Sequence, residues 1–120
     1  MKLLKSFAFA FNGFKICFTS EANFKIHMLL AAAAVLLGFM FGISNVEWLA
    51  VIFSIAFIAV TEMVNTAIEK LCDVVHKDFH PGIKKVKDIA AGAVLLAAVC
   101  SLVIGSIIFL PKMIVLIKSL

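Results

Sequence analysis

Three long apolar runs constrain the fold of this chain more than any other feature. They cover residues 27–43, 47–75 and about 86–110. Each run approaches or exceeds the roughly 17 to 25 residues that a transmembrane helix requires. Hydrophobic residues make up 64% of the chain and charged residues 15%, a balance far more apolar than that of soluble domains. We therefore expect an all-α membrane protein in which residues 1–120 form a single domain with three transmembrane helices.

The segment before the first run, residues 2–18, has a different character. Its apolar residues are mostly phenylalanines, and lysines, an asparagine and a glycine interrupt them. This pattern is typical of a helix that lies in the plane of the membrane interface with its lysines toward anionic head groups. A disordered basic tail is the alternative, although such tails are rarely so rich in phenylalanine. We therefore expect an amphipathic interfacial helix here.

The lysines predict the orientation in the membrane, because cytoplasmic loops carry the excess of basic residues. Residues 44–46, between the first two runs, contain no lysine. The N-terminus and the loop at residues 75–85 should therefore be cytoplasmic and the C-terminus external. The formal charge of +4 is too small to suggest a nucleic-acid partner. The lysines that favour the cytoplasmic side are Lys2, Lys5, Lys15, Lys25, Lys70, Lys77, Lys84, Lys85 and Lys87.

The most informative motif is EMVNTAIEKLCD, residues 62–73, because it places charge in the last turns of the second apolar run. Carboxylates inside a membrane are expensive and are usually functional. At about 100° per residue, one stripe of a helix collects the polar side chains. The stripe predicts a site that binds something polar, and it consists of Glu62, Asn65, Glu69 and Asp73.

Further charged groups lie at the same depth. Glu21 precedes the first run, and Lys87 and Asp88 open the third. A cluster of carboxylates beside a lysine suits a magnesium-bound nucleotide, since carboxylate oxygens hold the hard cation and an ammonium group neutralises phosphate charge. Neither G-x-x-x-x-G-K-[ST] nor G-x-G-x-x-G occurs, so a conventional phosphate-binding loop is absent.

Three strings, in this order and spacing, resemble the small bacterial membrane diacylglycerol kinase and undecaprenol kinase family: SEANFKIH at residues 20–27, EMVNTAIE at residues 62–69 and KDIAAGAVL at residues 87–95. The resemblance covers essentially the whole chain. It implies an interfacial helix followed by three transmembrane helices, assembled as a homotrimer in the bacterial cytoplasmic membrane with a cytoplasmic active site. It also implies transfer of the γ-phosphate of Mg-ATP to a lipid hydroxyl.

The resemblance implies a role for each matching residue. Glu62 is the general base that takes the proton from the lipid hydroxyl, and Asn65 is a second catalytic residue. Glu21 and Glu69 are the ligands of Mg²⁺, while Asp73 supports the site. Lys87 and Asp88 contact the phosphates and ribose of the nucleotide, and the loop Asp78, Phe79 and His80 also contacts the nucleotide. Phe9 and Lys2 are further nucleotide contacts, at positions where some members have a tyrosine and an arginine.

Depth in the bilayer predicts the same division of roles. Glu62 is the most deeply embedded acid, and desolvation makes a carboxylate a stronger base. Glu69 lies closer to water. A lipid would bring its hydroxyl laterally to Glu62, whereas ATP would approach Glu69, Glu21 and Lys87 from the cytoplasm.

Other functions stay open at this point. A small oligomeric transporter can be built around a buried glutamate, but it would place the acid near the bilayer centre, whereas here the acids gather at one end beside Lys87. A non-enzymatic membrane scaffold would bind no Mg-ATP. Among lipid kinases, the strings EWL at residues 47–49 and FHPGIKKVKDIAAGAVL at residues 79–95 resemble undecaprenol kinases more closely. We therefore expect undecaprenol as the lipid, with diacylglycerol as the alternative.

Several residues have structural explanations instead. Ser44 and Glu47 have the spacing of a capping box at the start of the second run. Trp48 is then expected to be an interfacial anchor. Gly38 and Gly42 form a G-x-x-x-G pattern that predicts close packing between helices.

Overall fold

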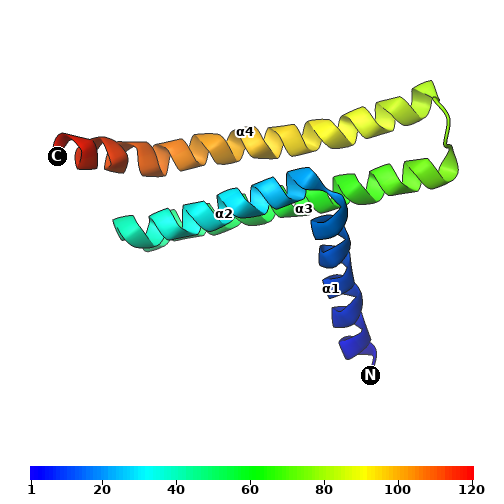
Figure 1. The fold of residues 1–120 in the computed structure, drawn as a ribbon, viewed down its shortest axis with the longest axis horizontal. Coiled ribbons are helices and arrows are strands. Elements are labelled where there is room, and N and C mark those ends of the chain that lie inside the picture. Colours follow the sequence, from blue (N-terminus) through cyan, green and yellow to red (C-terminus); the bar gives the residue numbers. More distant parts are fainter.

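The computed structural model describes residues 1–120 and contains four α-helices and no β-strand. Figure 1 shows α2, α3 and α4 lying alongside one another in alternating directions, while α1 leaves the bundle steeply at the start of α2. The end of α3 and the start of α4 extend beyond the corner between α1 and α2 (Figure 1). The expected all-α fold is confirmed, with helices α1 (Lys2–Ser20), α2 (Ala22–Phe41), α3 (Asn45–Val75) and α4 (Pro81–Lys118).

Three of the helices, α2, α3 and α4, are long and apolar enough to cross a membrane, as expected. The longest, α4, begins before the third apolar run and continues through Pro111 to Lys118. Its 38 residues measure about 57 Å at the rise of an α-helix, whereas the hydrocarbon core of a bilayer is about 30 Å thick. Part of α4 therefore extends outside the bilayer core.

Local sequence explains where the helices begin and end. The hydroxyl of Ser44 accepts a hydrogen bond from the backbone N–H of Glu47, and the carboxylate of Glu47 accepts one from the backbone N–H of Ser44. This confirms the predicted capping box. Gly42 ends α2 with a φ of 58°, a left-handed conformation that glycine adopts without strain. Pro81 is the first residue of α4, where its missing N–H costs nothing.

The other glycine of the G-x-x-x-G pattern, Gly38, makes room for a side chain of α3. Gly38 is buried, and a Cβ atom at this position would lie 2.6 Å from the nearest carbon of the Trp48 indole. The indole also packs on Phe39, with 4.9 Å between the ring centroids. The predicted close packing at Gly38 is therefore confirmed, and Trp48 takes part in it.

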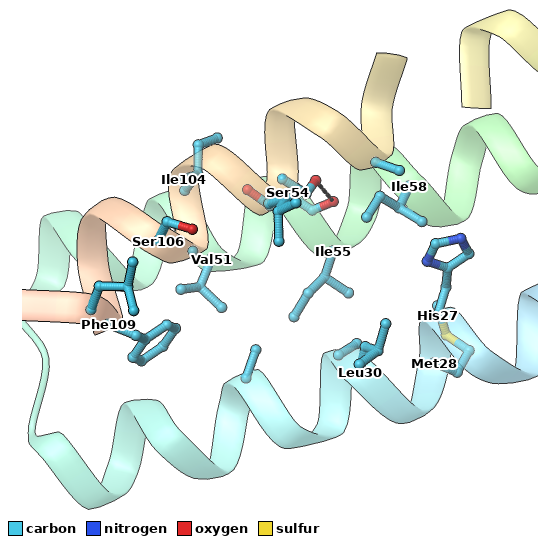
Figure 2. Close-up of a pocket in the computed structure, with 17 residues that line it drawn as sticks. His27, Met28, Leu30, Val51, Ser54, Ile55, Ile58, Ile104, Ser106 and Phe109 are labelled. Atoms are coloured by element: carbon cyan, nitrogen blue, oxygen red, sulfur yellow. Dashed lines mark hydrogen bonds between the residues drawn. The ribbon is translucent and has the colours of Figure 1, made fainter. Parts of the chain in front are cut away.

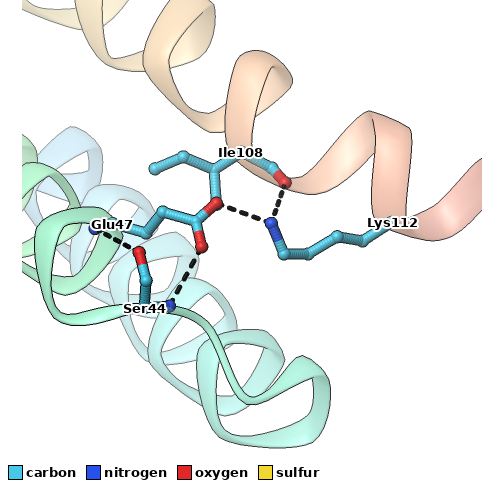
Figure 3. A network of polar contacts seen from close by, with 4 residues as sticks. All are labelled: Ser44, Glu47, Ile108 and Lys112. Atoms are coloured by element: carbon cyan, nitrogen blue, oxygen red, sulfur yellow. Dashed lines mark hydrogen bonds and ion pairs between the residues drawn. The ribbon is translucent and has the colours of Figure 1, made fainter.

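One ion pair fastens α4 to the turn between α2 and α3 (Figure 3). The Nζ atom of Lys112 donates to Oε2 of Glu47 at 2.6 Å and to the carbonyl oxygen of Ile108 at 3.1 Å. Because Glu47 also belongs to the capping box, one carboxylate links the start of α3 to α4. A small apolar core lies at the same end of the bundle and contains Ile43, Val51, Ile108 and Phe109.

Few side chains are buried within a single chain. Only 12 of the 120 residues are buried, and most of the large apolar side chains are exposed. A water-soluble monomer rarely exposes a continuous apolar surface of this extent. In a bilayer the same surface faces lipid tails or another helix, where it carries no such penalty.

Candidate active site

The polar stripe of α3 is turned into the protein. Glu62 and Thr66 are buried, and Asn65 and Glu69 are half-buried. Glu62 is only 4% exposed. Its Oε1 atom and the Oδ1 atom of Asn65 have no hydrogen-bond partner. Since nearly all buried polar atoms have a partner, these two oxygens have unused capacity to accept hydrogen bonds.

An imidazole from α2 faces Glu62. The Nε2 atom of His27 lies 3.2 Å from Oε1 of Glu62, in an alignment too poor for a hydrogen bond. The His27 side chain is 21% exposed, so it lies between the buried carboxylate and the surface of the chain. Sequence reasoning missed this residue. The available signal was a histidine at the inner end of an otherwise apolar run, because ionisable side chains in membrane helices are usually functional.

Helix geometry brings Glu21 and Glu69 to the same level. Glu21 is the single non-helical residue between α1 and α2. At the rise of an α-helix it lies about 9 Å from His27 along the axis of α2. On α3, Glu69 lies about 10 Å from Glu62 along the helix axis. The two helices run in opposite directions (Figure 1). Because His27 meets Glu62, Glu69 comes level with Glu21 at the corner of the bundle.

Acidic groups outnumber basic groups around Glu62. The ionisable side chains whose charge acts on it are His27, Glu21 and Glu69. Nδ2 of Asn65 donates a hydrogen bond to Oε1 of Glu69 at 3.3 Å, which helps to fix that carboxylate. Like charges that act on one another favour a cation between them.

The residues present fit a magnesium ion that arrives with its nucleotide. No group of three His, Cys, Asp or Glu side chains is arranged to hold a metal ion. Mg²⁺ in kinases is commonly bound by one or two carboxylates, with phosphate oxygens and waters completing its coordination. Two carboxylates at one level, Glu21 and Glu69, match this requirement.

Lys87 and Asp88 belong to separate ion pairs at the start of α4. Nζ of Lys87 donates to Oδ1 of Asp73 on α3 at 2.8 Å. Nζ of Lys84 donates to Oδ2 of Asp88 at 2.6 Å. Exposed ion pairs of this kind contribute little to stability, so phosphate groups can compete for both lysines. The Lys87 pair also connects the polar stripe of α3 to α4.

The loop between α3 and α4 and the first turns of α4 surround a polar cavity of about 320 Å³. Lysines and histidines dominate its lining, a composition that suits phosphate groups. His80 is held there by the backbone N–H of Gly82, which donates to its Nδ1 at 3.0 Å. Four of the residues assigned to the nucleotide by resemblance line this cavity together: Asp78, Phe79, His80 and Lys87. Lys84, the partner of Asp88, lines it as well.

Phe9 lies apart from these residues. It is 75% exposed on α1 and does not line the polar cavity. At about 100° per residue it shares the polar face of α1 with Lys2 and Lys5, on the side opposite to Phe7 and Phe11. The structure thus places the other predicted site residues on α3, at the start of α4, in the loop between these helices and at the corner before α2, and leaves Phe9 and Lys2 on α1 outside that group.

An apolar groove of about 450 Å³ begins next to the buried carboxylate. It lies between α2, α3 and α4, with His27 and Met28 at one end and Ser106 and Phe109 at the other (Figure 2). Most of its lining residues are hydrophobic. Because His27 both lines the groove and faces Glu62, the groove leads toward the carboxylate. No motif or periodicity in the sequence predicted this groove.

Comparison with known proteins assigns this arrangement to a class. The model of the family described as "Prokaryotic diacylglycerol kinase" matches residues 8–109. The chain is 39% identical over 112 residues to the undecaprenol kinase of Bacillus subtilis (strain 168), which covers 93% of this chain and 91% of that protein. It is 31% identical over 112 residues to the diacylglycerol kinase of Synechocystis sp., covering 92% of this chain and 64% of that protein. It is 22% identical over 102 residues to the diacylglycerol kinase of Escherichia coli (strain K12), covering 85% of this chain and 84% of that protein.

The three candidate spans define a multi-pass membrane protein. The chain belongs to the prokaryotic diacylglycerol kinase family. It is therefore a lipid kinase, with ATP and a lipid as its substrates, rather than a transporter or a scaffold. The resemblance seen in the three sequence strings is confirmed.

Proposed function

We propose that this lipid kinase transfers the γ-phosphate of Mg-ATP to the hydroxyl of undecaprenol, giving undecaprenyl phosphate. The observation that carries the proposal is the buried carboxylate of Glu62, which faces His27 at the end of the apolar groove. A lipid hydroxyl that arrives from the bilayer meets a carboxylate in a desolvated position. Such a carboxylate is a stronger base than one in water.

Glu62 and Asn65 act on the lipid in this proposal. Glu62 accepts the hydroxyl proton as the oxygen attacks the γ-phosphorus, a new O–P bond forms, and the bond from that phosphorus to ADP breaks. Nδ2 of Asn65 is bonded to Glu69, which leaves its Oδ1 atom free to accept a hydrogen bond and align the hydroxyl. Positioning of this kind, together with electrostatic stabilisation, supplies most of the catalysis in phosphoryl transfer.

The nucleotide occupies the cytoplasmic side of the same region. Glu21 and Glu69 would hold Mg²⁺, which would neutralise phosphate charge. Lys87 exchanges Asp73 for a phosphate oxygen. Asp88 binds the ribose, and Phe9 reaches the nucleotide from the polar face of α1. The loop residues that complete the nucleotide site are Asp78, Phe79 and His80, which line the polar cavity with Lys87.

The identity of the lipid is supported by the similarity to an undecaprenol kinase, at 39% identity over nearly the whole of both chains. Diacylglycerol is the second candidate, because other relatives at about 30% identity are diacylglycerol kinases. The test is phosphate transfer by the purified protein in lipid nanodiscs that contain both lipids in equal amounts. An excess of undecaprenyl phosphate supports the proposal, whereas an excess of phosphatidate replaces undecaprenol with diacylglycerol.

We place the enzyme in the bacterial cytoplasmic membrane as a homotrimer, with α1 at the interface and the site facing the cytoplasm. The steep angle of α1 to the bundle (Figure 1) and the large exposed apolar surface of the other helices support this arrangement. Chemical crosslinking in lipid should give trimers, and monomers alone would refute the assembly.

A further inference from the structure

We infer that His27 is a positioning residue for phosphoryl transfer: its Nε2–H donates a hydrogen bond to Oε1 of Glu62 and aims the carboxylate at the lipid hydroxyl. The inference rests on the proposed role of Glu62 as the general base and adds a residue to which no sequence motif assigned a function. Oε2 of Glu62 then remains to accept the proton of the lipid.

The geometry identifies the donor. Nε2 of His27 lies 3.2 Å from Oε1 of Glu62, close enough that a small rotation of the imidazole makes a hydrogen bond. Oε1 has no other hydrogen-bond partner although it is buried. Catalytic hydrogen bonds are often poorly aligned before substrate binds and tighten in the complex. The contact therefore has the distance and the free acceptor that a positioning bond requires.

The electrostatics point to the same residue. The ionisable groups whose charge acts on Glu62 are His27 on α2, Glu21 at the corner before α2, and Glu69 on α3. Ionised carboxylates only accept hydrogen bonds. His27 is thus the one member of this set that can donate to Glu62. A glutamate side chain has several rotatable bonds, so a single donor decides which oxygen faces the substrate.

His27 belongs to the apolar groove and not to the polar cavity. It lines the end of the apolar groove (Figure 2) and contacts the carboxylate from the side of α2. The polar cavity lies on α4 and the loop before it, and His27 is not part of its lining. Removing the imidazole should therefore change the chemical step without changing nucleotide binding.

The test compares His27→Leu, His27→Gln and Leu29→Ala in nanodiscs, with kcat and the KM for ATP measured separately. Loss of a group that orients another typically costs about 10- to 100-fold, so we expect His27→Leu to lower kcat by that factor with an unchanged KM for ATP. His27→Gln places an amide nitrogen near the same position and should restore most of the activity. Leu29 is exposed on the same helix, and its substitution should have no effect. Equal losses in the leucine and glutamine variants, or a normal kcat in the leucine variant, would overturn the inference.

A coupling measurement separates this inference from the proposed function. Glu62→Asp shortens the side chain by one methylene and withdraws the carboxylate from His27, so His27→Leu should cost little more in that background. If His27→Leu lowers kcat by the same factor in the Glu62→Asp background as in the wild type, the contact is contradicted. If Glu62→Gln is inactive while His27→Leu is normal, only the role of His27 fails. If Glu62→Gln is fully active, the base assignment fails and the inference fails with it.

Discussion

Replacing Gly38 with alanine tests the packing of α3 against α2, and the structure sets the size of the effect. A Cβ atom at this position would lie 2.6, 2.9 and 3.1 Å from three carbons of the Trp48 indole. Overpacking of this kind costs about 1 to 3 kcal/mol. Alanine is favoured over glycine in a helix by about 1 kcal/mol, which offsets part of that cost. We expect a net loss of about 1 kcal/mol in the free energy of unfolding.

The sign of the effect should reverse once the indole is removed. In a Trp48→Leu background the overlap is gone, and Gly38→Ala should stabilise the protein by about 1 kcal/mol. Unfolding in mixed detergent micelles is best followed by far-UV circular dichroism, because Trp48 is the only tryptophan and its fluorescence disappears in this background.

Gly105→Ala is the matched control, because a Cβ atom at Gly105 has no neighbour within 4 Å. It should behave alike in both backgrounds. If Gly38→Ala has the same effect with and without Trp48, the reasoning about this contact is refuted.

Further predictions concern the ion pairs and the metal. Lys112→Met and Glu47→Gln should each lower the midpoint of unfolding. Because the two residues form one ion pair, the double variant should lower the midpoint by less than the sum of the single effects. A fully additive effect would contradict this coupling. Glu69→Ala should raise the Mg²⁺ concentration needed for half-maximal turnover more than Asp73→Asn does, because Asp73 is occupied by Lys87; equal shifts in a magnesium titration would reverse the assignment. Lys87→Met should raise the KM for ATP about tenfold, the loss of one charge-assisted hydrogen bond, and an effect confined to the KM for lipid would count against it.

The transmembrane helices could be predicted from the sequence because the bilayer restricts the backbone structure of an apolar run. A membrane span must satisfy its backbone hydrogen bonds internally, so three long apolar runs predicted three helices. The capping box at Ser44 and Glu47 set the start of α3. The far end of α4 was not predicted, since the third apolar run was expected to end at about residue 110, whereas α4 continues to Lys118. Lys112 instead pairs with Glu47 on another helix, a tertiary contact that local sequence does not contain.

Helical spacing alone predicted only the part of the candidate site that lies on α3. The spacing of Glu62, Asn65 and Glu69 fixes their common face, and the structure turns that face inward. His27 was missed because its role depends on how α2 is rotated toward α3. Since α2 is apolar on almost every side, no periodicity indicates which of its faces meets Glu62. The apolar groove depends on three helices at once and was missed for the same reason.

The most direct test of the central claim is a single-turnover measurement of phosphate transfer from radiolabelled Mg-ATP to undecaprenol in nanodiscs, with the wild-type enzyme and Glu62→Gln compared at saturating nucleotide. Loss of a general base typically slows the chemical step by about 10²- to 10⁴-fold. We expect Glu62→Gln to bind Mg-ATP as the wild type does and to show a loss of this size in labelled lipid. Transfer at the wild-type rate by Glu62→Gln would contradict the account.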